Sequence, residues 1–291
     1  MIVNQAPLNE CNDGLDNDGD NAVDGVDFAC QQGGPNENSF MAQCQDGVDN
    51  DNDGSIDLSD SGCSNNQDNS EVVLSGLYND PLLILLMRFD QNEGSTVSDL
   101  SGNGNNGAAV GNAAWTASGY SGGGFAFDGT GDKINVKDGW TEFNNNFSIS
   151  VWINPVDDND LFGNVVSTSD LGSGNTVYLL VSTQYNFVRC MAGKSKTDRV
   201  ELDPWNDVGW HHYVCQRKDN GTIELYRDGV LVRSTAGAIA GNLALLNGND
   251  FLRVGGRYDD PQSFNGGIDE VAIFKRTLSA SEVLDIYEGR V

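Results

Sequence analysis

The first eighty residues of the chain contain no lysine and no arginine, although they include 17 aspartates and glutamates. Over all 291 residues, 43 acidic side chains stand against 16 basic ones, and the formal net charge is −27. A surface with this charge repels nucleic acids and anionic lipids, so both are excluded as partners. Cation-binding sites explain much of the acidity, and a halophilic origin is a second explanation.

Histidine is also scarce. The chain has only two, His211 and His212, and they are neighbours in the sequence. Adjacent residues of a strand point to opposite faces, so this pair cannot bind one metal ion or form a catalytic dyad. The sequence also lacks a serine nucleophile elbow, a phosphate-binding loop and the ligand spacing of a zinc site. These absences argue against the corresponding enzyme classes.

Long apolar segments are missing as well. The opening residues MIVNQAPLNE have neither the basic start nor the apolar core of a secretory signal peptide, so we expect that any leader has been removed. The apolar run LLILLM at 82–87 is far too short to span a membrane. We therefore predict no transmembrane segment.

One segment bounded by two cysteines occurs twice. CNDGLDNDGDNAVDGVDFAC (11–30) aligns without a gap with CQDGVDNDNDGSIDLSDSGC (44–63), and both cysteines and six aspartates are identical. Aspartates packed this densely repel one another unless a cation neutralises them. An acidic disordered linker is the alternative, but such a linker does not repeat one spacing between cysteines.

The spacing of these aspartates matches the calcium loop of EF-hands, in which side-chain and backbone oxygens surround a hard cation. The predicted ligands of the first loop are Asp16, Asp18, Asp20, Ala22, Asp24 and Asp27. Those of the second loop are Asp49, Asp51, Asp53, Ser55, Asp57 and Asp60. We predict one calcium ion in each loop.

The two loops resemble the aspartate-rich calcium repeats of thrombospondin type 3 and of related bacterial surface proteins. The resemblance covers residues 10–63 and implies compact, helix-poor loops that are ordered by bound calcium. It does not imply a calmodulin-like switch, because no amphipathic helix flanks either loop.

The six cysteines allow fifteen pairings, and the repeat symmetry favours Cys11 with Cys30 and Cys44 with Cys63. Cys190 and Cys215 both lie on predicted strands, where they form either a cross-strand disulfide or two buried thiols. Disulfides and low-affinity calcium sites indicate an extracellular or cell-surface location.

From about residue 83, glycine-rich turns separate many short alternating or apolar runs, such as FSISVWINP at 147–155. This pattern predicts an all-β sandwich. Asn-Gly and Asp-Gly within residues 218–222 and 227–230 predict hairpin turns. A C-terminal helix is expected at 279–289, where Ser279 and Glu282 form a capping box.

These patterns divide the chain into an N-terminal extended segment (1–9), the two repeats (10–30 and 43–63), a linker (64–82) and a sandwich domain (83–291).

The sandwich domain resembles a laminin G-like domain of the concanavalin-like jelly-roll type. The matching segments are 89–107, 125–136, 147–155, 209–232 and 264–283. They follow one another over the whole domain, so the resemblance is specific for the fold. It is weak for the ligand, because this fold serves many functions.

The family often carries a structural calcium where the first strand meets the last. The resemblance implies such a site at Asp99 and Asn103 in SDLSGNG and at Asp269 in GGIDEV. A carboxylate inside an apolar strand needs a partner. The alternative is that Asp99 and Asp269 cap loops through backbone hydrogen bonds.

Laminarinase-type hydrolases share this fold and use an E-x-D-x-x-E motif for retaining hydrolysis by two carboxylates. The nearest string here, ELDPWN at 201–206, ends in Asn206, and Pro204 interrupts the strand. One carboxylate is missing, so we predict a protein that is not an enzyme.

Two functions remain. The first is a structural or adhesive surface protein that self-assembles, because the apolar segments MIVNQAPL and SEVVLSGLYNDPLLILL flank the repeats and could add to a sheet edge of a second copy. The alternative is an extracellular lectin that binds a carbohydrate through the jelly-roll loops. Its sugar-stacking candidates are Trp140, Trp205 and Tyr258, which lie in loop-like stretches.

Overall fold

The computed structural model of the chain divides into two compact units, Met1–Ser75 and Gly76–Val291. It describes residues 10–19, 21–31, 36–37, 41–48, 56–59, 63, 66–67, 76–90, 94–138, 140–143, 146–156, 162–168, 176–193, 198–204, 208–235, 251–257 and 262–290.

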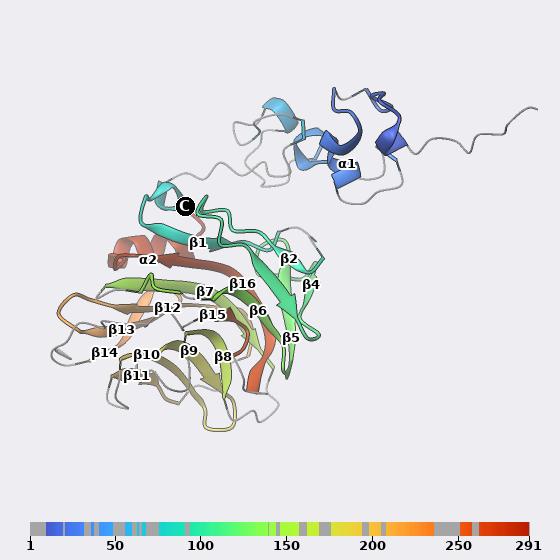
Figure 1. The fold of residues 1–291 in the computed structure, drawn as a ribbon. Coiled ribbons are helices and arrows are strands. Elements are labelled where there is room, and N and C mark those ends of the chain that lie inside the picture. Colours follow the sequence, from blue (N-terminus) through green and yellow to red (C-terminus); the bar gives the residue numbers. More distant parts are fainter. Residues whose placement is uncertain are drawn as a thin grey trace, which may run out of the picture. The chain divides into compact units, whose positions relative to one another are not determined.

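The first unit is built from single turns around two disulfides (Figure 1). Its helical turns are η1 (Glu10–Asn12), η2 (Asp24–Val26), α1 (Phe28–Gln31), η3 (Gln43–Gln45) and η4 (Asp57–Ser59). The bonded pairs are Cys11–Cys30 and Cys44–Cys63, with Cα atoms 5.5 and 5.6 Å apart. The apolar side chains that this unit buries among its described residues are small, so the disulfides supply much of what a larger core would otherwise provide.

The second unit is a jelly-roll sandwich of the concanavalin-like type (Figure 1). Sheet A runs in the order β14 (Val230–Ser234), β13 (Ile223–Arg227), β12 (His211–Arg217), β7 (Phe147–Pro155) and β16 (Gln262–Phe274). β5 (Gly124–Thr130) pairs with the first part of β16 and β1 (Leu83–Met87) with its last part, and β4 (Ala114–Thr116) lies beyond β5. Sheet B runs in the order β11 (Arg199–Leu202), β10 (Phe187–Gly193), β9 (Thr176–Ser182), β8 (Gly163–Thr168), β15 (Phe251–Val254), β6 (Lys133–Asp138), β3 (Gly107–Val110) and β2 (Thr96–Val97).

Alternation along the strands fills the space between the sheets. In β7, Ile149, Val151 and Ile153 are fully buried in the core, whereas Ser150 and Trp152 point to the other side of sheet A. The predicted hairpin turns are present. Asp228 and Gly229 join β13 to β14 with φ of 50° and 79°, the left-handed conformation that Asp-Gly favours.

A disulfide crosses the core of the sandwich. Cys190 on β10 of sheet B is bonded to Cys215 on β12 of sheet A, and both residues are fully buried. The bond therefore joins opposite sheets rather than neighbouring strands of one sheet.

The C-terminal helix α2 (Ala280–Tyr287) covers the outer side of sheet A, where Tyr287 stacks on Trp152. The predicted capping box is formed, because the Ser279 side chain accepts the N–H of Glu282 while the Glu282 carboxylate accepts the N–H of Ser279. Arg276 holds Glu282 in place, and hydrogen bonds from Arg276 lower the pKa of Glu282 to about 2. Among the helices that the structure describes, none has the length and apolar character needed to cross a membrane.

Candidate functional site

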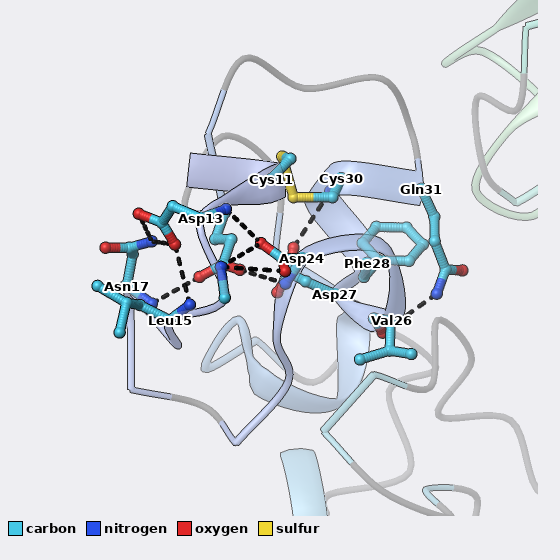
Figure 2. Close-up of a disulfide and its surroundings, with 12 residues drawn as sticks. Cys11, Asp13, Leu15, Asn17, Asp24, Val26, Asp27, Phe28, Cys30 and Gln31 are labelled. Atoms are coloured by element: carbon cyan, nitrogen blue, oxygen red, sulfur yellow. Dashed lines mark hydrogen bonds between the residues drawn. A yellow bond between two sulfur atoms is a disulfide. The ribbon is translucent and has the colours of Figure 1, made fainter. Parts of the chain in front are cut away.

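The first repeat closes through a carboxylate at its far end (Figure 2). Asp24 accepts the backbone N–H of Asp13 at 2.9 Å and that of Gly14 at 3.1 Å, next to the Cys11–Cys30 disulfide. Asp13 in turn accepts the N–H of Leu15 at 2.9 Å. These bonds tie the two ends of the loop together.

The second repeat uses the same bonds 33 residues later. Asp57 accepts the N–H of Gly47 at 3.0 Å, and Asp46 accepts the N–H of Val48 at 2.8 Å. Asp57 also adopts the same φ of 51° as its counterpart Asp24. The repeat seen in the sequence is therefore a repeat in structure.

An acidic triad, formed by two residues of the first repeat and one that follows it, could hold an ion. Asp16, Asp18 and Glu37 each offer one carboxylate oxygen, and these oxygens lie within 4.8 Å of one another. Three carboxylates this close repel one another, and a hard cation with oxygen ligands is the natural counterpart. Glu37 is buried, and its two oxygens accept the N–H groups of Asn17 at 2.5 Å and of Asp24 at 2.6 Å.

The triad differs from the predicted ligand set in two ways. Asp24 ties the loop together, and Asp27 caps α1 by accepting the N–H of Cys30 at 3.1 Å, so neither carboxylate joins the triad. Glu37 was not predicted, because it follows Cys30 by seven residues and lies outside the repeat. Ala22 is buried in the loop, and its role as a carbonyl ligand stays a prediction.

The remaining predicted ligands of the two loops lie outside the residues that the structure describes. They are Asp20, Asp49, Asp51, Asp53, Ser55 and Asp60. In the second loop, Asp57 is described and ties the loop, as Asp24 does in the first. A calcium ion in the second loop therefore stays a prediction.

Asp99 and Asn103 fasten a loop of the sandwich to β1. Asp99 accepts the N–H groups of Leu86 and Asn105 at 3.0 and 2.9 Å, and Asn103 donates from its side-chain amide to the carbonyl of Leu83 at 3.0 Å. These are the loop-capping bonds of the alternative interpretation.

Asp269 has a similar role elsewhere in the sandwich. Its carboxylate accepts the N–H groups of Tyr120 at 2.8 Å, Ser121 at 3.0 Å and Glu270 at 2.8 Å. Within the described part of the chain, neither Asp99 nor Asp269 belongs to a group of three acidic side chains close enough to share an ion. Backbone N–H donors account for both carboxylates.

Asp269 also belongs to a buried charged cluster with Arg88, Asp90 and Glu270. Arg88 contacts Glu270 at 3.1 Å and Asp90 at 3.2 Å. Burial, together with the Glu270 charge, raises the pKa of Asp269 to about 8. Burial also raises the pKa of Glu270 to about 7, against the opposing effect of Arg88. One guanidinium thus pairs with two of the three carboxyl groups, Asp90 and Glu270.

The two histidines have separate partners, as the alternation of the strand requires. His212 is fully buried, its Nε2 lies 2.8 Å from Ser150 Oγ, and burial lowers its pKa to about 3. His211 lies on the other side of β12 with Nδ1 2.9 Å from the Asp228 carboxylate. The pair forms no common site.

The prediction that Trp140 stacks on a sugar is wrong. Its side chain is fully buried and packs edge-on against Phe143, with ring centroids 5.8 Å apart. Trp205 and Tyr258 lie outside the described residues.

An aromatic platform with one exposed ring lies instead around the turn between β9 and β10. We define it by Phe162, Tyr185 and Phe187. Tyr185 is 55% exposed, and its ring is parallel to that of Phe187 within 5°. Phe162 lies 6.1 Å from Tyr185 and 6.3 Å from Phe187, measured between ring centroids. The signal for it in the sequence is the tyrosine in the turn TQYNF (183–187), which was not among the predicted sugar-stacking residues.

The chain is similar in sequence to a known protein family and to one adhesion receptor. Residues 128–284, more than half of the chain, match the family model Laminin_G_3, described as the concanavalin A-like lectin/glucanases superfamily. The chain belongs to this superfamily. Its sequence is also similar to adhesion G-protein coupled receptor V1 of Danio rerio, with 28% identity over 152 residues. That similarity covers 49% of the chain but only 2% of the receptor.

Solved structures of other proteins show a similar fold. Domain 4 of AbnA, an extracellular arabinanase of Geobacillus stearothermophilus in complex with arabinotriose, matches 70% of this chain and 98% of its own with a TM-score of 0.55 at 22% identity. Trypanosoma rangeli sialidase in complex with 2,3-difluorosialic acid matches 72% of this chain and 33% of its own, with a TM-score of 0.56 at 17% identity. The binding domain of botulinum neurotoxin serotype D matches 72% and 51%, with a TM-score of 0.54 at 17% identity. Likeness at these identities establishes the fold and leaves the ligand open.

Proposed function

We propose that the chain is a non-enzymatic extracellular carbohydrate-binding module whose N-terminal unit binds calcium. The observation that carries the proposal is the aromatic platform around Tyr185. An exposed ring braced by two others offers a flat, rigid face, and such faces stack on the apolar faces of sugar rings. The arabinotriose complex of domain 4 of AbnA, 98% of which is matched, supports this use of the fold.

An adhesive role outside the cell is supported by independent features. Three disulfides fit an oxidising compartment. The sequence relative is an adhesion receptor. The triad of Asp16, Asp18 and Glu37 supplies carboxylate oxygens of the kind that calcium prefers. Calcium there would order a unit that has little apolar core of its own.

The proposal that the chain is not an enzyme is supported by the structural partners of three carboxylates, Glu201, Asp269 and Glu270. Glu201, the first residue of the string that resembles a hydrolase motif, is ion-paired with two arginines. Asp269 accepts three backbone N–H groups, and Glu270 is paired with Arg88. Each of these groups already has a structural partner.

The test is a screen of the full chain against immobilised glycans in calcium. We expect binding to one group of saccharides, and Tyr185→Ala should weaken it about 2- to 10-fold because one stacking face is lost. Tyr120→Ala is the matched control, since Tyr120 is also exposed but stacks on Trp152, outside the platform.

Self-assembly, the other function expected from the sequence, gives a different result. In that case the chain binds no glycan, and light scattering at micromolar concentration shows growth on addition of calcium. This outcome would replace the proposal of a carbohydrate-binding module.

A further inference from the structure

Two arginines share one carboxylate beside the aromatic platform. Arg189 lies on β10, and Arg199 and Glu201 lie on β11, with Arg189 paired in register with Glu201. The alternate residues of β10, Val188 and Cys190, belong to the core between the sheets. Arg189, Arg199 and Glu201 therefore project from the outer face of sheet B.

Glu201 contacts each guanidinium through one nitrogen only. Its Oε1 lies 2.6 Å from Arg189 Nε and 2.9 Å from Arg199 Nε. Among the described residues, the terminal Nη groups of both arginines donate no hydrogen bond, and Glu201 is the ion-pair partner of each guanidinium. The carboxylate cancels one of the two charges, so one positive charge and several N–H donors are left over.

The arginines continue the aromatic platform. The guanidinium carbon of Arg189 lies 4.4 Å from the centre of the Phe187 ring, and Phe187 is parallel to Tyr185. The side chains of Arg189, Arg199 and Glu201 are 13%, 31% and 29% exposed. One continuous stripe thus runs from an exposed aromatic ring to an unsatisfied pair of guanidinium groups.

The charge of this stripe is opposite to that of the chain. Its described charged side chains are two arginines, Arg189 and Arg199, and one carboxylate, Glu201, which leaves one positive charge. The whole chain has a net charge of −27. A local positive surplus on such a protein attracts an anion that the rest of the surface repels.

We propose that this stripe binds a sugar ring that carries a carboxylate, such as a uronic acid. The inference rests on the proposed function and specifies its ligand class. The sugar ring stacks on the exposed ring of Tyr185, and its carboxylate accepts hydrogen bonds from the Nη groups of Arg189 and Arg199. Guanidinium groups match planar carboxylates with paired hydrogen bonds. A sugar fits better than an acidic peptide, because a peptide carboxylate would make no use of the aromatic rings.

The test is titration calorimetry of the full chain in calcium with two matched probes, an oligogalacturonate and the neutral galactose oligomer of the same linkage. We expect the oligogalacturonate to bind more tightly. Arg199→Gln should weaken it about 10- to 100-fold, because hydrogen bonds to a charged group are lost. Arg290→Gln makes the same charge change at an exposed site after α2 and should leave binding unchanged.

A second variant tests the shared carboxylate. Glu201→Gln removes the competing charge, so the oligogalacturonate should bind more tightly while the neutral oligomer is unaffected. Equal affinity for both probes, with no effect of Arg199→Gln, overturns the carboxylate inference but leaves carbohydrate binding intact. If neither probe nor any saccharide of the glycan screen binds, both proposals fail.

Two further probes distinguish other anions. Oligoglutamate that binds as tightly as oligogalacturonate, with no effect of Tyr185→Ala, would show a general anion surface and overturn the inference. A sulfated oligosaccharide that binds more tightly than the oligogalacturonate would also overturn it, because the site would then select charge rather than a carboxylate.

Discussion

The Glu37 carboxylate accepts the backbone N–H of Asp24 at 2.6 Å, although the disulfide-bonded Cys30 lies between them in the sequence. Its other oxygen accepts the N–H of Asn17. A residue from outside the repeat thus holds both arms of the loop and places a third carboxylate beside Asp16 and Asp18. Folding of the loop and assembly of the acidic triad are therefore linked through Glu37.

Glu37→Gln should remove one calcium ion from the binding stoichiometry of the full chain. The amide keeps an oxygen for one backbone N–H but removes the charge that a hard cation requires. Isothermal titration with calcium measures the change, and disulfide mapping checks that Cys11–Cys30 still forms. Glu10→Gln, an equal charge change in the same unit, should leave the stoichiometry intact. An unchanged stoichiometry in Glu37→Gln would rule out this residue as a ligand.

Removing the disulfide between the sheets should destabilise the sandwich. The Cys190→Ala/Cys215→Ala variant loses a cross-link over 25 residues, which typically contributes about 3 kcal/mol, and it leaves small cavities in the core. Calorimetry of the full chain should show a lower Tm for the larger transition. Cys11→Ala/Cys30→Ala lies in the other compact unit and should leave that transition in place. Equal shifts in the two variants would contradict this assignment.

Local patterns in the sequence were sufficient for much of the fold. Alternation predicted the strands, Asp-Gly at Asp228 and Gly229 predicted a hairpin, and Ser279 with Glu282 predicted the start of α2. Each of these features depends on neighbours within a few residues. The repeat symmetry likewise indicated both disulfides of the first unit.

Features that depend on distant neighbours could not be predicted. Glu37 joins the acidic triad through a hydrogen bond to Asn17, 20 residues away in the sequence, and no spacing rule contains it. Trp140 follows a strand in a loop-like stretch, but its side chain packs against Phe143 in the hydrophobic core. Arg189 and Arg199 are brought together only when β10 pairs with β11, and the sequence alone does not show that register.

Asp269→Ala should destabilise the sandwich by about 2–4 kcal/mol, because the N–H groups of Tyr120, Ser121 and Glu270 lose their common acceptor. The loss should be the same in calcium and in chelator, since hydrogen bonds need no ion. Thermal unfolding of the full chain in both conditions measures it, with Asp285→Ala on the exposed side of α2 as the control. A loss confined to calcium would instead establish the ion site expected from the family resemblance.

His212 should make the sandwich sensitive to acid. Its pKa is about 3 in the folded state because of burial, against about 6.5 in an unfolded chain. The unfolded state therefore binds the extra proton between these values, and stability falls by up to about 1.4 kcal/mol per pH unit as pH drops below 6.5. Asp269 and Glu270 act in the opposite direction, because their raised pKa values favour the folded state as pH falls from about 8 to 4.

The wild type must therefore be compared with His212→Gln, whose amide can still bond to Ser150 but takes up no proton. Denaturant unfolding at pH 7.5 and pH 5 should show a larger drop in stability for the wild type than for the variant. Equal drops would mean that His212 is protonated as readily in the folded chain as in the unfolded one, which its burial forbids.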